Sequence, residues 1–397
     1  MSLNNTPGAN RIHIGFFGRR NVGKSSTVNA FTGQDLAVVS DTKGTTTDPV
    51  RKAMELLPLG PVMIIDTPGF DDEGTLGEMR VKKTLQVLRK TDIAVLVADA
   101  AEALGACEKE LIALFQQREI PYLIAYNKCD IITKRADLAP NERYISAKTG
   151  EGIHALKEAC AALRTAQADK PIVGDLLERG DMVILVVPID ESAPKGRLIL
   201  PQVQTLRDIL DVGAQALVVK ESELKSALAA LNTPPKMVIT DSQVFAFVSD
   251  IVPKEIPLTS FSILMARYKG YLQTAYRGVQ ALHTLQDGDT VLIAEGCTHH
   301  RQCNDIGTVK IPRWLHQISG KEIHIQTCSG TEFPEDLSAY KMVIHCGGCM
   351  LTQREVKYRM NTCIEAGVPF VNYGIFIAYA TGILERSVEL FDLNDDK

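Results

Sequence analysis

The chain has 397 residues, 45% of them hydrophobic and 23% charged, and a formal net charge of -5 at pH 7. This composition is that of an ordinary soluble globular protein, and the length predicts roughly two or three domains. The acidic balance, without a basic tail, argues against nucleic acid as a partner. The polar N-terminus, which has no apolar leader, predicts a cytoplasmic protein.

Short apolar runs alternate with helical stretches from residue 12 to about residue 164, which predicts a doubly wound α/β sheet. The expected strands are 12–17, 62–65, 93–98 and 122–126. A polar segment, 166–170, precedes Pro171 and marks the first boundary. We therefore expect the first domain to cover residues 1–170.

A phosphate-binding loop follows the first of these strands. Residues 18–25 read Gly-Arg-Arg-Asn-Val-Gly-Lys-Ser and match G-x-x-x-x-G-K-[ST] between a strand and a helix. Backbone N–H groups of such a loop surround phosphates, Lys24 reaches the β and γ phosphates, and Ser25 ligates Mg²⁺. The predicted nucleotide-binding residues here are Gly18, Asn21, Val22, Gly23, Lys24, Ser25 and Ser26.

Two further motifs indicate the cation and the base. After the second strand, Asp66-Thr-Pro-Gly69 offers a carboxylate for the Mg²⁺ shell and the Gly69 N–H for the γ-phosphate. After the fourth strand, the Asp130 carboxylate can accept two hydrogen bonds that guanine offers and adenine does not. The predicted base-binding residues are Asn127, Lys128, Asp130, Ser146, Ala147 and Lys148. The domain is therefore predicted to bind GTP or GDP with Mg²⁺ and to hydrolyse GTP.

These motifs resemble those of translation-factor-class GTPases, particularly the bacterial tRNA-modification and ribosome-assembly types. Their GTTxD switch motif reads Gly-Thr-Thr-Thr-Asp over residues 44–48. Either Thr45 or Thr46 should close on Mg²⁺ and the γ-phosphate when GTP is bound. With Thr46 as the Mg²⁺ ligand beside Ser25 and Asp66, the predicted catalytic residues are Lys24, Thr45, Thr46, Asp66 and Gly69.

Phe70 stands where Ras-like enzymes place the glutamine that orients water. GTPases of the resembling class with a hydrophobic residue here often use K⁺ near the phosphates, helped by an asparagine at the position of Asn21. The resemblance therefore implies K⁺-stimulated hydrolysis. The alternative for Asn21 is a side chain that only stabilises the turn.

The alternation of strands and helices restarts twice in the rest of the chain. Expected strands lie at 181–187, 215–219, 236–240 and 257–263, and then at 290–294, 322–326, 342–345 and 369–373. The fold class is thus α/β: a P-loop G domain followed by two smaller α/β domains with mainly parallel sheets, at 171–262 and 263–397. An uncharged stretch, 366–384, is interrupted by proline and glycine, so we expect a strand and a buried helix there and no membrane segment.

Cysteines and histidines follow two strands of the last set. Cys297-Thr-His299 comes after one, and His345-Cys346-Gly-Gly-Cys349 comes after the other. Because the carboxyl ends of parallel strands meet at one sheet edge, these side chains can form a metal site. The donor set suits a Cys₃His zinc site as well as a 4Fe-4S cluster with one non-cysteine corner. Near the first motif, Cys303 is the reserve ligand and His300 is expected to be a surface or supporting side chain.

The combination of C-x-H and H-C-x-x-C behind a G domain and a middle α/β unit resembles the HydF family, the maturation GTPases of FeFe-hydrogenases. The resemblance spans the whole chain. It implies a 4Fe-4S cluster on Cys297, Cys346 and Cys349, with His299 and His345 as fourth ligands or supporting donors.

The same resemblance implies the biological role. A scaffold of this family carries a transient diiron subcluster precursor, completes it and passes it to apo FeFe-hydrogenase. Radical-SAM maturases are the other expected partners, and residues 171–262 are the expected dimerisation domain of a homodimer. The alternatives are a ribosome- or tRNA-processing GTPase with a zinc-stapled C-terminal domain, and a redox enzyme that uses the cluster for electron transfer.

Overall fold

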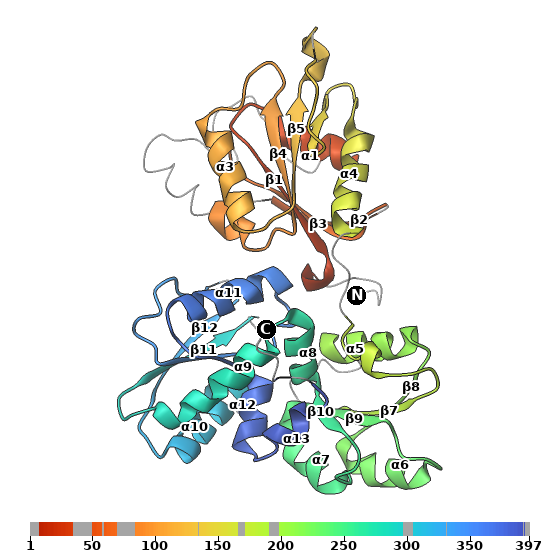
Figure 1. Cartoon of the computed structure of the whole chain (residues 1–397), viewed down its shortest axis with the longest axis vertical. Coiled ribbons are helices and arrows are strands. Elements are labelled where there is room, and N and C mark those ends of the chain that lie inside the picture. The colour runs from red at the N-terminus through yellow and green to blue at the C-terminus, as the bar shows by residue number, and fades with distance from the viewer. Residues whose placement is uncertain are drawn as a thin grey trace. The chain divides into compact units, whose positions relative to one another are not determined.

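The structure is a computed structural model. It describes residues 8–34, 50–57, 59–69, 84–133, 135–165, 171–189, 198–296, 305–330, 332–391 and 393. Its contacts separate the chain into two compact units, Met1–Asp169 and Lys170–Lys397. Each unit is described by itself (Figure 1). The predicted division of the second unit at residue 262 stays a prediction.

A six-stranded sheet with the order β2-β3-β1-β4-β5-β6 forms the middle of the first unit. Its strands are β1 (Ile12–Phe17), β2 (Val50–Leu56), β3 (Gly60–Asp66), β4 (Ile93–Asp99), β5 (Tyr122–Asn127) and β6 (Glu142–Tyr144). All neighbours are parallel except β2, which pairs antiparallel with β3. The sequence prediction omits β2, because five of its seven residues are exposed and no apolar run signals an edge strand of this kind.

Helices cover both faces of this sheet, as the doubly wound pattern predicts. On one face, α3 (Ala106–Gln117) and the helical residues 84–88 bury Phe115, Leu111 and Leu88 against the strands. On the other face, α1 (Lys24–Thr32) and α4 (Ile153–Thr165) bury Phe31 and Leu156 (Figure 1). The short helices η1 (Gly8–Asn10) and η2 (Cys129–Ile131) lie in connections.

The second unit contains two four-stranded, wholly parallel sheets, with orders β10-β9-β7-β8 and β12-β11-β13-β14. The strands of the first are β7 (Met182–Val186), β8 (Gln215–Val219), β9 (Met237–Thr240) and β10 (Leu258–Ser260). Those of the second are β11 (Thr290–Glu295), β12 (His324–Ser329), β13 (Met342–His345) and β14 (Phe370–Asn372). The fold class predicted from the sequence is confirmed.

The connections of the second unit are mostly helical. The helices around the first sheet are η3 (Gly174–Leu176), α5 (Leu200–Asp211), η4 (Glu221–Glu223), α6 (Leu224–Ala230), η5 (Ser242–Val244) and α7 (Phe245–Ile251). Those that follow are α8 (Phe261–Lys269), α9 (Leu272–Val279), η6 (Gln280–Thr284), η7 (Ile306–Lys310), α10 (Ile311–Ser319), α11 (Gln353–Glu365), α12 (Tyr373–Ala380) and α13 (Leu384–Val388).

Helix α8 joins the two sheets. The strand expected over 257–263 ends at Ser260, because the Ser260 hydroxyl accepts a hydrogen bond from the Ile263 N–H at 3.3 Å and caps a helix instead. One continuous hydrophobic cluster includes Val238 of the first sheet, Ile263 of α8 and Ile344 of the second sheet. The two sheets therefore share a core.

The uncharged stretch over 366–384 has the predicted structure. It contains β14 and the buried helix α12, whose residues 373–378 are all buried. Across the described part of the chain, helices are either too short or too polar to cross a bilayer.

Candidate functional site

The phosphate-binding loop connects β1 to α1 through three residues with positive φ. Gly18 has φ 148°, Asn21 has φ 63° and Gly23 has φ 83°. A Cβ on Gly18 would lie 2.3 Å from the Val97 carbonyl oxygen, and one on Gly23 would lie 2.3 Å from Asn127 Nδ2. Both glycines are therefore required by close packing as well as by conformation. Helix α1 begins at Lys24, so its N-terminus faces the loop, as anion binding needs.

Ser25 and Asp66 lie side by side as the predicted Mg²⁺ ligands. The Ser25 hydroxyl donates to Asp66 Oδ2 at 2.7 Å. The other carboxylate oxygen, Oδ1, is buried without a hydrogen bond and lies 4.0 Å from Lys24 Nζ. Burial raises the pKa of Asp66, against the effect of Lys24 and Ser25. A buried carboxylate oxygen lacking a hydrogen bond, beside a hydroxyl, fits the all-oxygen coordination of Mg²⁺.

Gly69 lies against the phosphate-binding loop, since a Cβ on it would meet Arg20 Cγ at 2.5 Å and Arg20 N at 3.1 Å. The predicted switch threonines and the residue after Gly69 complete the expected γ-phosphate site. Thr45, Thr46 and Phe70 lie outside the described residues.

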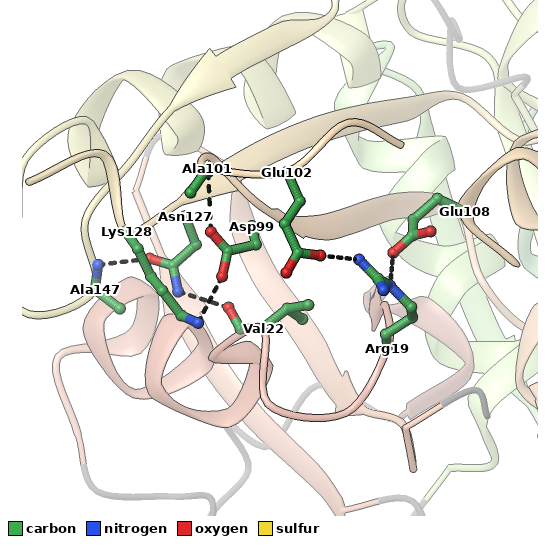
Figure 2. Close-up of polar contacts among 9 residues, drawn as sticks. All are labelled: Arg19, Val22, Asp99, Ala101, Glu102, Glu108, Asn127, Lys128 and Ala147. Carbon is green, nitrogen blue, oxygen red and sulfur yellow. Dashed lines mark hydrogen bonds and ion pairs between the residues drawn. The ribbon is translucent and has the colours of Figure 1, made fainter. Parts of the chain in front are cut away.

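The base-binding motifs are joined by Asn127 (Figure 2). Its Nδ2 donates to the Val22 carbonyl at 2.9 Å, and its Oδ1 accepts from the Ala147 N–H at 2.9 Å. Lys128, at φ 65°, extends to Asp99 at the end of β4, with 2.6 Å between Nζ and Oδ2. Asn127 therefore connects the phosphate loop to the base loop.

The predicted guanine-reading carboxylate is held by a neighbouring loop of the protein. Asp130 Oδ1 accepts from the Ser146 hydroxyl at 2.7 Å, and the Thr149 N–H donates to the same hydroxyl oxygen at 3.1 Å. The hydrogen bond from Ser146 lowers the pKa of Asp130, which keeps the acid ionised. Lys148 follows in the same loop and is exposed.

Arg19 is a polar anchor that the sequence reasoning missed (Figure 2). Its guanidinium pairs with Glu108, the third residue of α3, and with Glu102 at 2.7 Å. Glu108 is fully buried and also accepts from the Gly105 N–H at 3.0 Å. These carboxylates raise the pKa of Arg19. Because residues 19 and 108 are far apart in the chain, no local pattern signals the pair.

The C-x-x-C loop follows β13 at the carboxyl edge of its sheet. Cys346 Sγ accepts hydrogen bonds from the Gly296 N–H at 3.0 Å and the Gly348 N–H at 3.4 Å. Gly296 directly follows β11 and is the last described residue before Cys297, so the position next to Cys297 contacts this loop. Cys297, His299, His300 and Cys303 lie outside the described residues.

His345 supports the loop from inside the sheet. It is fully buried, its Nδ1 lies 2.6 Å from the Cys346 carbonyl oxygen, and its Nε2 lies 3.3 Å from Arg359 Nη1. Because arginine only donates, Nε2 is the acceptor and Nδ1 carries the proton. Burial lowers the pKa of His345 to about 3, with the Arg359 charge acting in the same direction. Both ring nitrogens are thus engaged within the protein.

Cys346 and Cys349 are free thiols, and burial raises the pKa of both. The N–H groups directed at Cys346 Sγ oppose that rise. Two thiols on one glycine-containing loop, one of them receiving backbone N–H groups, fit a soft metal or a cluster. Within the described ranges, no set of three or more histidine, cysteine, aspartate or glutamate side chains is arranged to hold a metal ion.

Comparison with family models covers most of the chain in three segments. Residues 13–128 match a 50S ribosome-binding GTPase, 172–270 match the hydrogen maturase F dimerization domain, and 273–390 match the hydrogen maturase F tetramerization domain. The predicted GTPase domain, with GTP or GDP and Mg²⁺, is therefore confirmed, and the chain carries oligomerisation domains. Sequence reasoning anticipates a dimer but not a tetramerisation domain.

Curated relatives match the first unit. The chain is 33% identical over 141 residues to a tRNA modification GTPase MnmE from Thiobacillus denitrificans, which covers 35% of this chain and 31% of the relative. It is 35% identical over 151 residues to the MnmE of Chromobacterium violaceum, covering 37% and 33%. The chain thus spans about a third of the length of these relatives.

A solved structure of Era in complex with MgGDPNP and a 16S ribosomal RNA segment is also similar. It covers 52% of this chain and 93% of that chain, at 19% identity and a TM-score of 0.35. The two hydrogen maturase F models together cover both sheets of the second unit, and they follow the GTPase domain in the order that the sequence predicts. The chain therefore belongs to the hydrogen maturase F (HydF) family.

Proposed function

We propose that this chain is a K⁺-stimulated GTPase and a 4Fe-4S scaffold, on which the diiron subcluster precursor of FeFe-hydrogenase is completed before its transfer to apo-hydrogenase. The observation that carries the proposal is the contact between the two cysteine-bearing strand ends. The Gly296 N–H, next to Cys297, donates to Cys346 Sγ at 3.0 Å. In a member of the HydF family, this contact supports a shared site for the two cysteine motifs.

The first unit supplies the GTP chemistry. Water attacks the γ-phosphorus, the bond to the β–γ bridging oxygen breaks, and GDP and phosphate leave. Lys24 and the loop N–H groups stabilise the charge that develops on the phosphate oxygens, and Asp130 selects guanine. Bound Mg²⁺, held by Ser25 and Asp66, and K⁺ near Asn21 would supply additional positive charge.

The second unit supplies the cluster ligands. Cys297, Cys346 and Cys349 would hold a 4Fe-4S cluster, with His299 as the candidate for the fourth position and Cys303 as the reserve ligand. His345 suits the supporting role better, because its ring nitrogens are bonded to Cys346 O and Arg359. A cluster held by three thiolates would carry a weaker, exchangeable ligand at its fourth corner, where an incoming iron fragment could bind.

The nucleotide state would then control the partners. GTP and GDP would favour different contacts with the radical-SAM maturases and apo-hydrogenase, so that hydrolysis times loading or release.

Anaerobic reconstitution with iron and sulfide tests the cluster. A reducible 4Fe-4S signal in electron paramagnetic resonance (EPR) is expected for the wild-type chain and for Cys328→Ser. The control residue Cys328 lies at the end of β12, in register with Ala294. Cys349→Ser should lose the signal. Zinc in the purified chain without a reducible iron signal would instead support the ribosome- or tRNA-processing alternative.

Hydrolysis rates in K⁺ and Na⁺ test the cation. We expect faster turnover in K⁺, and Asn21→Gly should remove the difference, since glycine keeps the positive φ of residue 21 and deletes the amide. Equal wild-type rates in the two salts would refute K⁺ stimulation. A K⁺ effect that survives in Asn21→Gly would leave Asn21 as a turn residue only.

A further inference from the structure

Lys269 ends helix α8 directly behind the cysteine loop. Its side chain is buried, at 5% relative exposure. The ammonium group donates to the Leu351 carbonyl at 2.8 Å and to the Gly348 carbonyl. A long cationic side chain is seldom buried unless a partner compensates its charge.

The junction of α8 and α9 holds the loop at several points. Besides the two bonds from Lys269, the Tyr271 hydroxyl donates to the Gly347 carbonyl at 3.4 Å. Gln353 Nε2 of α11 donates a hydrogen bond to the Lys269 carbonyl at 3.4 Å. The conformation of the C-x-x-C loop therefore depends on residues at the end of α8.

Among the ion pairs of the described residues, none involves Lys269. Burial lowers the pKa of Lys269 to about 8. The nearby thiols of Cys349 and Cys346 act against this effect, because a thiolate favours the charged amine. Two neutral carbonyls alone compensate a buried ammonium poorly.

A second buried lysine in the same chain, in the phosphate-binding loop, offers a comparison. Among the described residues only Lys24 and Lys269 are lysines buried below a tenth of their surface, at 8% and 5%. Lys24 is the lysine of the phosphate loop, whose partner is an anionic ligand. Lys269 stands in a comparable relation to the cysteine loop.

We infer that Lys269 is the counter-charge of the proposed cluster site, with its ammonium group stabilising the negative charge of a cluster bound by Cys346 and Cys349. This inference rests on the proposed function. A 4Fe-4S cluster with three thiolates is anionic and gains a further negative charge on reduction, so a buried cation beside it raises its reduction potential. Lys269 is thus a positioning residue with an electrostatic effect.

Two substitutions separate charge from hydrogen bonding. Lys269→Gln keeps an N–H donor for the loop carbonyls and removes the charge, whereas Lys269→Met removes both. The control is Lys357→Met, because Lys357 is exposed on α11 and its Cε would lie 3.4 Å from a Cβ placed on Gly270. The measurement is an EPR-monitored redox titration of the reconstituted full-length chain, together with iron content.

We expect Lys269→Gln and Lys269→Met to shift the midpoint potential to more negative values, with the control unchanged. A wild-type potential in Lys269→Gln would overturn the inference and leave a purely structural lysine. If both variants lose their near-ultraviolet circular dichroism signal, and with it their native packing, the test uses the wild-type chain with ¹⁵N-labelled lysine. The measured quantity is then the ¹⁵N coupling to the reduced cluster. Absence of ¹⁵N coupling to the reduced cluster would then refute it. A wild-type chain with no reducible cluster would refute the proposed function itself.

Discussion

At the scale of single residues, the phosphate-binding loop is held from two sides. Asn127 bonds to the Val22 carbonyl on the side of the base pocket, and Arg19 pairs with Glu108 on the side of α3 (Figure 2). Asn127 therefore has a role inside the protein besides membership of the guanine motif. Arg19 is bonded to a carboxylate that has no access to water.

Arg19→Met should destabilise the first unit, because it leaves the Glu108 carboxylate buried without its cation. Because Arg19 itself is 35% exposed, we expect a loss of about 2 kcal/mol, below the cost of breaking a fully buried pair. Hydrogen exchange at the amides of α1 and α3, measured in the full-length chain, reports the free energy of opening.

The matched control is Arg135→Met, which removes a pair with Glu151 in which both side chains are more than 40% exposed. A much smaller loss of stability is expected there, because solvent screens an exposed pair. Equal effects of the two substitutions would contradict the buried-anchor interpretation.

Sequence reasoning predicts these side chains unevenly. Ser25, Asp66, Asn127 and Asp130 belong to motifs whose spacing encodes a shared task, and the described structure brings Ser25 to Asp66 and Asn127 to the phosphate loop. Arg19 and Lys269 carry no such pattern. Arg19 is 89 residues from its partner Glu108, and Lys269 is 79 residues from its partner Gly348, so only the folded chain reveals these contacts.

At the scale of elements, α8 explains why the middle of the chain is hard to interpret from sequence. It is buried on two faces, with Ile263 and Ala266 in one hydrophobic cluster and Leu264 and Met265 in another. A helix buried on both sides has the continuous apolar run of a buried strand. The predicted strand over 257–263 therefore continued three residues past Ser260.

Asp175→Asn should weaken the attachment of η3 to α8. Arg267 Nη1 donates to Asp175 Oδ1 at 2.9 Å, and Nη2 donates to Oδ2. This hydrogen bonding lowers the pKa of Asp175. The ionised Asp175 therefore stabilises the folded state fully above the unfolded-state pKa of about 3.9, and this contribution is lost as the pH falls through the lower folded-state pKa. At neutral pH we expect a loss of about 0.5 to 1 kcal/mol, since the pair is partly exposed.

Urea titrations followed by the fluorescence of Trp314, the single tryptophan of the chain, measure this difference between pH 7 and pH 4. The difference in the free energy of unfolding between wild type and Asp175→Asn should stay constant down to about pH 5 and become smaller below it. Asp211→Asn, in an exposed pair with Arg207, serves as the control and should change little. A gap that widens on acidification would contradict the assignment.

At the scale of the whole molecule, the family models assign oligomerisation to both parts of the second unit. Strand β8 is the edge of its sheet, and exposed apolar side chains lie on it and on the neighbouring α5. They are Val203, Leu210 and Val218. An uncharged apolar edge of this kind is a surface on which a second copy can pair.

Val218→Lys should therefore reduce the assembly to a smaller species, because a charge on an edge strand opposes strand pairing. Light scattering coupled to gel filtration measures the mass. Ile131→Lys is the comparison, since Ile131 is 64% exposed but belongs to the first unit. An unchanged mass for Val218→Lys would exclude this edge from the interface.

The core shared by the two sheets bears on how the chain can be divided for experiments. The dimerization and tetramerization matches meet between residues 270 and 273, directly after α8. A truncation there would separate α8, with Ile263 and Ala266, from α9, α11 and α12, which pack against it, and would expose apolar surface in both fragments. Fragments for expression should instead be divided near residue 170, at the boundary of the two compact units, so that both sheets are produced and purified as one piece.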